Sequence, residues 1–211
     1  MIHLGIVEPD TAAGRNAVLG QLLQAGNLTD AVISKDTNGK PRLIFTPPRR
    51  CGYSIAQIRI GPERLAVMAI CEGADLGVDA EVRRRGAADA AFLETIAAPE
   101  DGTALKLLGA DGFDPSVGLW TIKEAALKCS GEVMIDPRHL AAARHASKAW
   151  KVSPSVLAGA PFAQVLVKLL SASLADHGPV EIIIALATSA EKMPDFKYVT
   201  AQTNLANIVT V

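Results

Sequence analysis

The sequence has few aromatic residues and no long apolar run. Only 4% of its 211 residues are Phe, Trp or Tyr, although 49% are hydrophobic. The core must therefore be built mainly from Ala, Val, Leu and Ile. The longest apolar stretches, such as residues 180–187, are too short or too charged to cross a bilayer. We expect a globular protein that has no membrane partner.

The cysteines give no sign of a disulfide framework or of a thiolate metal site. Cys51, Cys71 and Cys129 lie far apart in the sequence and form no CxxC pair. The first nine residues include an acidic residue and lack a basic stretch, so no signal peptide is predicted. We expect reduced thiols that fill the core of a cytoplasmic protein.

The charges are nearly balanced, with 21 basic and 22 acidic residues and a formal net charge of -1. Such a balance creates no overall field that would attract nucleic acid, and we expect no nucleic-acid partner. An acidic partner would need a local cluster of basic residues. The chain is long enough for one large domain or for two small, closely packed halves.

Hydrophobic patterning predicts an α+β fold, in the order helix, strands, helices, strands. The predicted helices cover residues 17–23, 87–97, 114–128, 137–150 and 162–175, with 103–108 as either helix or loop. The predicted strands cover residues 40–45, 53–59, 65–70, 76–81, 180–188 and 198–211. Tight turns join the three strands between residues 53 and 81, so we expect these strands to share one antiparallel sheet.

Two carboxylates lie close together on one of the predicted strands. Asp79 and Glu81 are two residues apart, so both side chains project from the same face. Paired carboxylates repel each other unless a cation lies between them, and Mg²⁺ prefers such oxygen ligands. The alternative, which is commoner for an isolated pair of this kind, is an exposed face with two solvated acids.

A predicted helix downstream carries polar residues at helical spacing. Trp120, Glu124 and Lys128 recur every four residues on one face, with Lys123 one position aside. Alone, the Glu–Lys pair is typical of a solvated helix face, where it contributes about 0.3–0.5 kcal/mol. The strand motif and the helix motif become specific only together and in this order.

Together the two motifs resemble the signature of the 4′-phosphopantetheinyl transferase superfamily. Residues 76–81, LGVDAE, are similar to that family's G-[IV]-D-x-E strand. Residues 120–131, WTIKEAALKCSG, are similar to its W-x-x-K-E-A-x-x-K-x-x-G helix. Residues 38–43 resemble its G-K-P element more weakly, so the motifs cover roughly residues 15–131.

The resemblance implies a fold and a domain organisation. The chain length favours the single-chain type, in which two similar α/β halves pack as a pseudo-dimer, each with a small antiparallel sheet and helices. The N-terminal half, residues 1–75, would supply nucleotide-side contacts. The C-terminal half, residues 76–211, would hold the metal site and the signature helix. Coenzyme A would lie in the cleft between them, and we expect a monomer.

The resemblance also implies an activity. Such enzymes transfer 4′-phosphopantetheine from coenzyme A to a serine of an acyl or peptidyl carrier protein, and they release 3′,5′-adenosine bisphosphate. By resemblance, Asp79, Glu81 and Glu124 would bind Mg²⁺, which neutralises charge on the diphosphate. Glu124, or water held by the metal, would accept the serine proton. Lys128 would contact phosphate oxygens during catalysis.

Further basic residues are expected to contact coenzyme A. Lys40 and Arg42 would face its 3′-phosphate, and Lys123 is assigned to the cofactor as well. The family has a Ser-His-Ser motif before the hairpin, whereas residues 56–61 here read AQIRIG. Counting back from the turn puts Arg59 in the place of the histidine, and a shift of one step along the strand would offer Gln57 instead.

This departure leaves a second interpretation open, in which a catalytically impaired protein of the same fold binds coenzyme A or docks a carrier. A third interpretation is an unrelated α+β protein whose acidic residues do not converge. Residues 83–85, three arginines, are either a solvated basic turn or a docking patch for acidic carrier helices.

Overall fold

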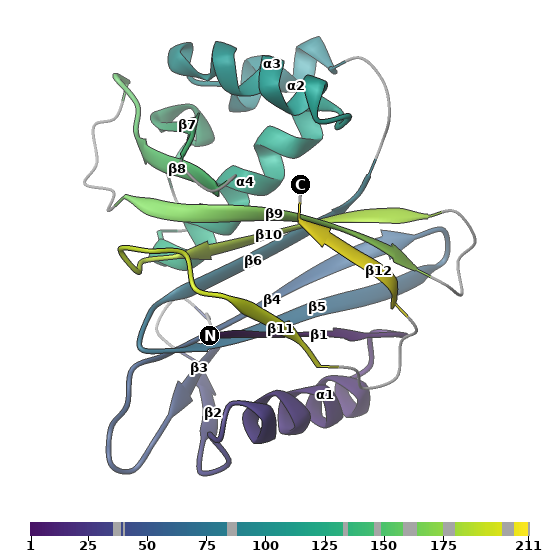
Figure 1. Ribbon diagram of the computed structural model, residues 1–211, viewed down its shortest axis with the longest axis vertical. Helices are drawn as coiled ribbons and strands as arrows, with labels where there is room; N and C mark the ends of the chain where they lie inside the picture. Colours follow the sequence, from purple (N-terminus) through teal and green to yellow (C-terminus); the bar gives the residue numbers. More distant parts are fainter. Residues whose placement is uncertain are drawn as a thin grey trace.

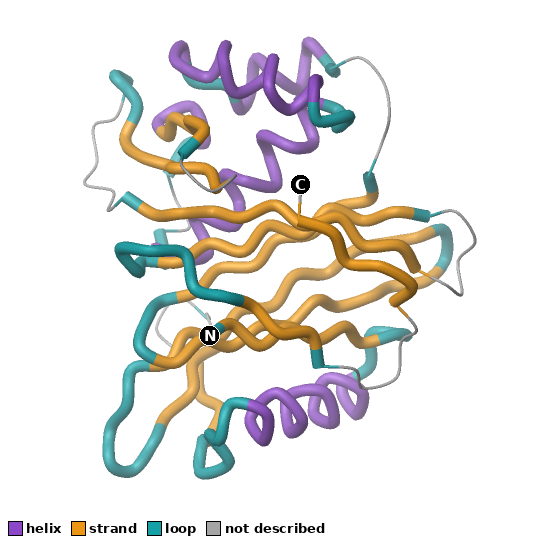
Figure 2. The backbone as a smooth tube through the Cα atoms, viewed as in Figure 1, coloured by secondary structure: helices purple, strands orange, loops and turns teal. Residues whose placement is uncertain are grey.

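The computed structural model of this chain describes residues 1–35, 39, 41–83, 88–132, 135–145, 149–157, 164–174, 180–199 and 205–210. Two β-sheets lie face to face in the middle of the molecule, and helices cover both outer sides (Figure 1). Figure 2 shows the same layering, with strands gathered between two helical regions. The α+β class predicted from the sequence is confirmed.

The first sheet has four strands in the order β11–β1–β5–β4. All neighbours in it are antiparallel except β11, which joins β1 in parallel. One helix, α1, packs on its outer face, and a separate ribbon is formed by β2 and β3. The elements are β1 (Ile2–Val7), α1 (Ala12–Ala25), β2 (Val32–Lys35), β3 (Pro41–Ile44), β4 (Cys51–Ile60), β5 (Glu63–Glu72) and β11 (Phe196–Tyr198).

The second sheet has six strands, in the order β6–β10–β9–β8–β7 with β12 also paired to β9. Its outer face is covered by α4, which packs on β6, β10 and β9. The strands are β6 (Leu76–Val82), β7 (Leu140–Arg144), β8 (Ala149–Pro154), β9 (Val165–Leu174), β10 (Glu181–Thr188) and β12 (Leu205–Thr210). The helices are α2 (Ala90–Ile96), α3 (Gly102–Ala110) and α4 (Pro115–Ser130), with short 3₁₀ turns at η1 (Pro99–Asp101) and η2 (Pro137–His139).

The signature helix α4 has well-defined ends. Its N-cap is Asp114, whose carboxylate accepts hydrogen bonds from the backbone N–H groups of Ser116 and Val117. Pro115 occupies the first helical turn, where its missing N–H costs nothing. The helix ends at Gly131 in the left-handed conformation, with φ of 79°. The predicted span, 114–128, is therefore close to the observed one.

Aliphatic side chains fill the space between the sheets, as the scarcity of aromatic residues predicts. Alternate residues of β1, β6 and β10 point into this core, which follows from the period of two along a strand. Examples are Leu4 on β1, Val78 on β6 and Ile184 on β10, all 0% exposed. The opposite face of β6 is thereby turned toward α4.

Two of the predicted helices are wrong. Residues 137–150 form η2 and the start of a β7–β8 hairpin, and residues 162–175 contain strand β9. The Ala-rich sequence of β7 favours a helix only as an intrinsic propensity, which tertiary pairing overrides. β9 lies between two strands and has apolar residues on both faces, so periodicity alone could not distinguish it from a buried helix.

The expected three-stranded sheet of residues 53–81 is also wrong in part. β4 and β5 form an antiparallel hairpin, but β6 pairs with β10 in the other sheet. β4 and β6 nevertheless approach closely between the sheets, because a Cβ on Gly52 would lie 2.5 Å from the backbone nitrogen of Leu76. None of the helices in the described parts of the chain is both long enough and apolar enough to cross a membrane.

Candidate active site

The backbone of α4 lies directly on β6 at Gly77. A Cβ at this position would lie 2.0 Å from the carbonyl oxygen of Ala125 and 2.4 Å from the nitrogen of Cys129. Only glycine permits such an approach of helix and strand. Residues 79 and 81 share the face of Gly77, so both carboxylates of the D-x-E pair are turned toward α4.

Asp79 and Lys128 form an ion pair across this contact. The Nζ atom of Lys128 lies 2.6 Å from Oδ1 of Asp79. The side chain of Asp79 is 9% exposed and that of Lys128 is 32% exposed, so the pair joins a nearly buried carboxylate to a partly exposed ammonium. A charge-assisted bond of this length is among the stronger interactions available to a carboxylate.

The second oxygen of Asp79 is unsatisfied by the described protein atoms. Oδ2 is buried and accepts no hydrogen bond from them. Burial raises the pKa of Asp79, and the ammonium of Lys128 opposes that rise. Burial raises the pKa of Glu124 too, and the nearby charge of Asp79 raises it further. The charge of Asp79 thus acts on Glu124, which places the two carboxylates near each other and near the unused oxygen Oδ2.

This arrangement fits a hard divalent cation. Among the described residues, no group of three or more His, Cys, Asp or Glu side chains forms a ready-made metal cage. Mg²⁺ does not require one, since it is usually held by one or two carboxylates together with waters and substrate phosphates. Asp79 Oδ2 and Glu124 supply such a partial ligand set.

Glu81 lies further along β6, where it lines a cavity of about 330 Å³. Two helix-capping residues, Asp89 and Asp114, also line the cavity. Its apolar wall includes Phe92 and Trp120, whose ring centroids are 5.7 Å apart. The structure thus places Glu81 beside Trp120, one step along the strand from the Asp79–Glu124 pair.

A cationic cavity of about 390 Å³ adjoins the opposite end of the α4–β6 contact. Arg42, Arg49 and Arg50 line it, whereas Asp75 is its one lining carboxylate among the described residues. Arg50 donates hydrogen bonds to Asp75 and to Ser189. The cavity also borders the last turn of α4 at Cys129, directly after Lys128. It lies where elements of both sheets meet.

Lys123 lies elsewhere, although it is next to Glu124 in sequence. It is 0% exposed, and its Nζ donates hydrogen bonds to Asp101 at 2.6 Å, to the carbonyl of Ile96 at 2.7 Å and to that of Pro137 at 3.0 Å. Burial lowers the pKa of Lys123, and the charge of Asp101 opposes that shift. With its ammonium enclosed in this way, Lys123 has a structural role in place of the expected cofactor contact.

Arg59 does not join the cluster either. It is exposed near the β4–β5 turn, paired in register with Arg64. β4 touches β6 at Gly52 and again at Ser54, whose Oγ accepts a hydrogen bond from the N–H of Val78 at 2.9 Å. Five residues of strand separate Ser54 from Arg59, which is roughly 16 Å. The alternative residue, Gln57, donates a hydrogen bond to Asp10.

The expected contact of Lys40 with coenzyme A and the possible docking patch at residues 83–85 fall wholly or partly outside the described residues. Lys40 lies outside the described residues, as do Arg84 and Arg85. Arg83 is described, and its guanidinium donates to Glu181 and Ser171 and lies 4.8 Å above the ring of Phe113. These contacts connect the α3–α4 turn to the second sheet, so Arg83 is committed to the fold.

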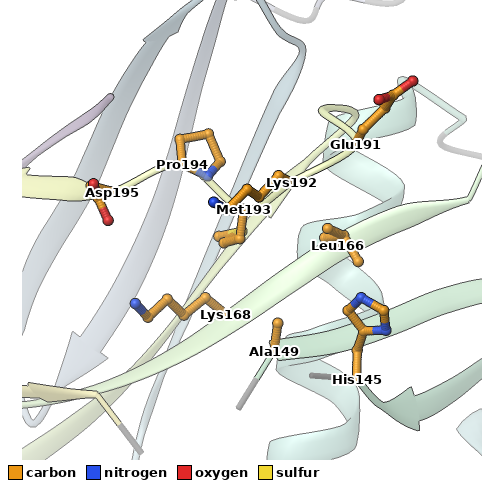
Figure 3. A pocket seen from close by; sticks show the side chains of 9 residues that line it. All are labelled: His145, Ala149, Leu166, Lys168, Glu191, Lys192, Met193, Pro194 and Asp195. Atoms are coloured by element: carbon orange, nitrogen blue, oxygen red, sulfur yellow. The ribbon is translucent and has the colours of Figure 1, made fainter. Parts of the chain in front are cut away.

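A third cavity, of about 270 Å³, lies on the face of the second sheet away from α4. Figure 3 shows Leu166 and Lys168 of β9 beside His145 and residues 191–195. Its charged side chains are two lysines and two carboxylates, so the charges balance. Lys168 lies 5.0 Å above the ring of Phe196, which further limits its availability. The cavity lacks the paired carboxylates found at α4.

Sequence reasoning missed two arginines of the cationic cavity. Arg49 and Arg50 follow two prolines, and no motif assigned either of them to a site. The signal was the pair of adjacent positive charges just before β4. Comparison of the chain with known protein families and with curated proteins gives no match.

Proposed function

We propose that the protein is a magnesium-dependent 4′-phosphopantetheinyl transferase that modifies a serine of an acyl or peptidyl carrier protein. The observation that carries the proposal is the order of features along the α4–β6 contact. A cationic cavity lies at one end, Asp79, Glu124 and Lys128 lie in the middle, and the Glu81 cavity lies at the other end. This order suits a substrate that carries a phosphorylated nucleotide, then a diphosphate, then a pantetheine arm.

The strand order supports the pseudo-dimeric version of this fold. In the first sheet β1 pairs with β5, which pairs with β4, and α1 follows β1 in sequence. In the second sheet β6 pairs with β10, which pairs with β9, and α2–α4 follow β6. All four pairings are antiparallel. Residues 1–75 and 76–211 would then be the two halves, with β11 returning to the first sheet.

The residues of this chain have distinct roles in the proposed reaction. Arg42 and Arg49 bind the 3′-phosphate, for which guanidinium groups are well suited. Asp79 and Glu124 would hold Mg²⁺, with Glu81 as a further carboxylate on the same face of β6. When bound, the ion neutralises charge that develops on the departing diphosphate oxygen.

The proton of the acceptor serine needs a base. In the proposed step the serine oxygen forms a bond to the β-phosphorus, and the bond from that phosphorus to the oxygen of adenosine bisphosphate breaks. Glu124 takes the proton that the serine loses. Its raised pKa suits this role, because a base acts best when its pKa lies nearer the working pH.

A second candidate function is a coenzyme A-binding or carrier-docking protein of the same fold without turnover. One observation favours it. Where β4 meets β6, the side chain present is Ser54, and its hydroxyl oxygen is occupied by Val78. Arg59 is the only basic side chain on β4, and it lies roughly 16 Å along β4 from Ser54, the residue that binds the neighbour of Asp79. The site would then lack one phosphate contact that the resemblance implies.

The test is transfer itself. The protein is incubated with coenzyme A, Mg²⁺ and several apo carrier proteins, and the intact mass of each carrier is measured. We expect a gain of one phosphopantetheine group, which chelation of the metal and Glu124→Gln abolish. Glu94→Gln, on the exposed face of α2, is the matched control and should leave transfer unchanged. Coenzyme A binding by calorimetry without any mass gain would favour the second function.

A further inference from the structure

Lys128 makes a contact whose chemistry differs from that of a phosphate-binding lysine. We propose that Lys128 is a positioning residue, which fixes the Asp79 carboxylate through Oδ1 and leaves Oδ2 as the oxygen that binds the cation. The inference rests on the proposed metal site. It assigns Lys128 a task that precedes substrate binding and does not require coenzyme A.

The bond from Lys128 fixes the orientation of the Asp79 carboxylate. Rotation of a carboxylate about its last torsion is broad and has roughly two-fold symmetry, so an unbound aspartate does not present one oxygen in a defined direction. The 2.6 Å bond from Lys128 Nζ removes this freedom by holding Oδ1. Oδ2 is then the remaining acceptor, and it is buried without a hydrogen-bond donor among the described residues.

The α4 helix presents both Glu124 and Lys128 to Asp79. Lys128 and Glu124 lie four residues apart on α4, so both project from the same face. Because Gly77 seats this helix directly on β6, a single rigid contact places both side chains relative to Asp79. Carboxylates that ligate metals are commonly held by an outer hydrogen-bond partner, whose removal lowers metal affinity by about 10–100-fold. Lys128 is placed to be that partner.

Three roles for Lys128 predict different signs of effect on metal binding without coenzyme A. A lysine that only contacts phosphate leaves metal affinity unchanged when it is removed. A lysine that competes with the metal for Asp79 weakens metal binding, so its removal increases metal affinity. Loss of the repulsion between the ammonium and the cation acts in the same direction. A lysine that positions Asp79 strengthens binding, and its removal decreases affinity.

Binding of Mn²⁺ to the protein without coenzyme A, followed by electron paramagnetic resonance and calorimetry, separates these roles. We expect Lys128→Met to weaken Mn²⁺ binding by about 10–100-fold and Lys128→Arg to restore part of the loss. Lys106→Met, which removes an exposed charge on α3, should have no effect. In an Asp79→Asn background, Lys128→Met should cause little further loss, because its effect acts through Asp79.

Two results would overturn the inference. One is Mn²⁺ affinity that is unchanged or increased in Lys128→Met while the wild-type protein binds Mn²⁺, which leaves the proposed function intact. The other is a wild-type protein that binds no Mn²⁺ with or without coenzyme A, which rejects the metal-dependent function as well. Circular dichroism checks that each variant is folded. If Lys128→Met does not fold, Lys128→Ala, which also removes both the donor and the charge, provides the same comparison.

Discussion

Substituting Lys123 tests whether α4 is held by its buried ion pair. In Lys123→Met the ammonium is lost from a site that is 0% exposed, and the Asp101 carboxylate is left without its counter-charge. The carbonyl groups of Ile96 and Pro137 lose a donor as well. Breaking a buried pair from one side costs about 3–5 kcal/mol. We expect Lys123→Met to lower the free energy of unfolding by this amount.

Asp101 links several elements of the helical layer, so loss of its ion pair with Lys123 should destabilise the whole layer. Its Oδ2 accepts from the N–H of Ala98 as well as from Lys123, and its Oδ1 accepts from the N–H of Ala142. The pair thus joins α4 to the segment after α2, to η1 and to β7. An unpaired charge at this junction cannot reach water without opening it.

Urea denaturation of the wild-type protein and three variants measures the effect. Lys123→Met should lower the midpoint without changing the slope, which indicates a loss of stability and not a change in the surface exposed on unfolding. The double variant Lys123→Met/Asp101→Asn loses the uncompensated charge but turns an amide NH2 toward one of the two backbone N–H groups that Asp101 binds, so it should stay below the wild type in stability. Lys106→Met should remain within about 0.5 kcal/mol of wild type. A cost below about 1 kcal/mol for Lys123→Met would refute the reasoning.

Three further predictions concern the seat of α4, the cationic cavity and acid stability. Gly77→Ala should cost at least about 1–3 kcal/mol in thermal unfolding, because its Cβ would meet the carbonyl of Ala125 at 2.0 Å. Gly20→Ala, on an open face of α1, should instead stabilise by about 0.5–1 kcal/mol, and equal effects would contradict this reading. Arg49→Glu should raise the KM for coenzyme A roughly tenfold with little change in kcat, because the contact of Arg49 with the 3′-phosphate is the same in the ground state and the transition state. An unchanged KM would show that the cavity does not bind coenzyme A. Hydrogen bonds from Arg138 lower the pKa of Asp136 to about 2 from 3.8. A lowered pKa in the folded state stabilises the fold above about pH 4, and this stabilisation is lost as the pH falls toward 2. The free energy of unfolding of Asp136→Asn should therefore differ from that of the wild type at pH 7 and not at pH 2. A difference that persists at pH 2 would exclude this cause.

The sequence predicted those elements whose signals are local. The α4 helix carries its own N-cap, an early proline and a terminal glycine, and it lies within two residues of the predicted span. The β4–β5 hairpin has a turn at Gly61, where φ is 58°, between two alternating strands. The resemblance implied that Asp79, Glu81 and Glu124 share one metal site with Lys128 beside it. The structure brings Asp79, Glu124 and Lys128 together and places Glu81 in the adjoining cavity beside Trp120.

Features that depend on tertiary placement were not predictable from one sequence. Nothing local in residues 165–174 shows that β9 would be enclosed by strands on both sides. Lys123 looks like another basic residue of a phosphate-binding helix, and its burial depends on acceptors brought from Ile96, Asp101 and Pro137. Arg59 was placed by counting from a turn, which cannot determine where along β4 the other sheet makes contact.

A crystal structure of the protein with coenzyme A and Mn²⁺ would show whether the α4–β6 contact binds both the metal and the cofactor. We expect anomalous scattering from a single ion at Asp79 Oδ2 and Glu124, next to the diphosphate of coenzyme A. The 3′-phosphate should lie in the cavity lined by Arg42 and Arg49. Coenzyme A bound away from the α4–β6 contact, or bound there with no ion at Asp79, would contradict the proposed function.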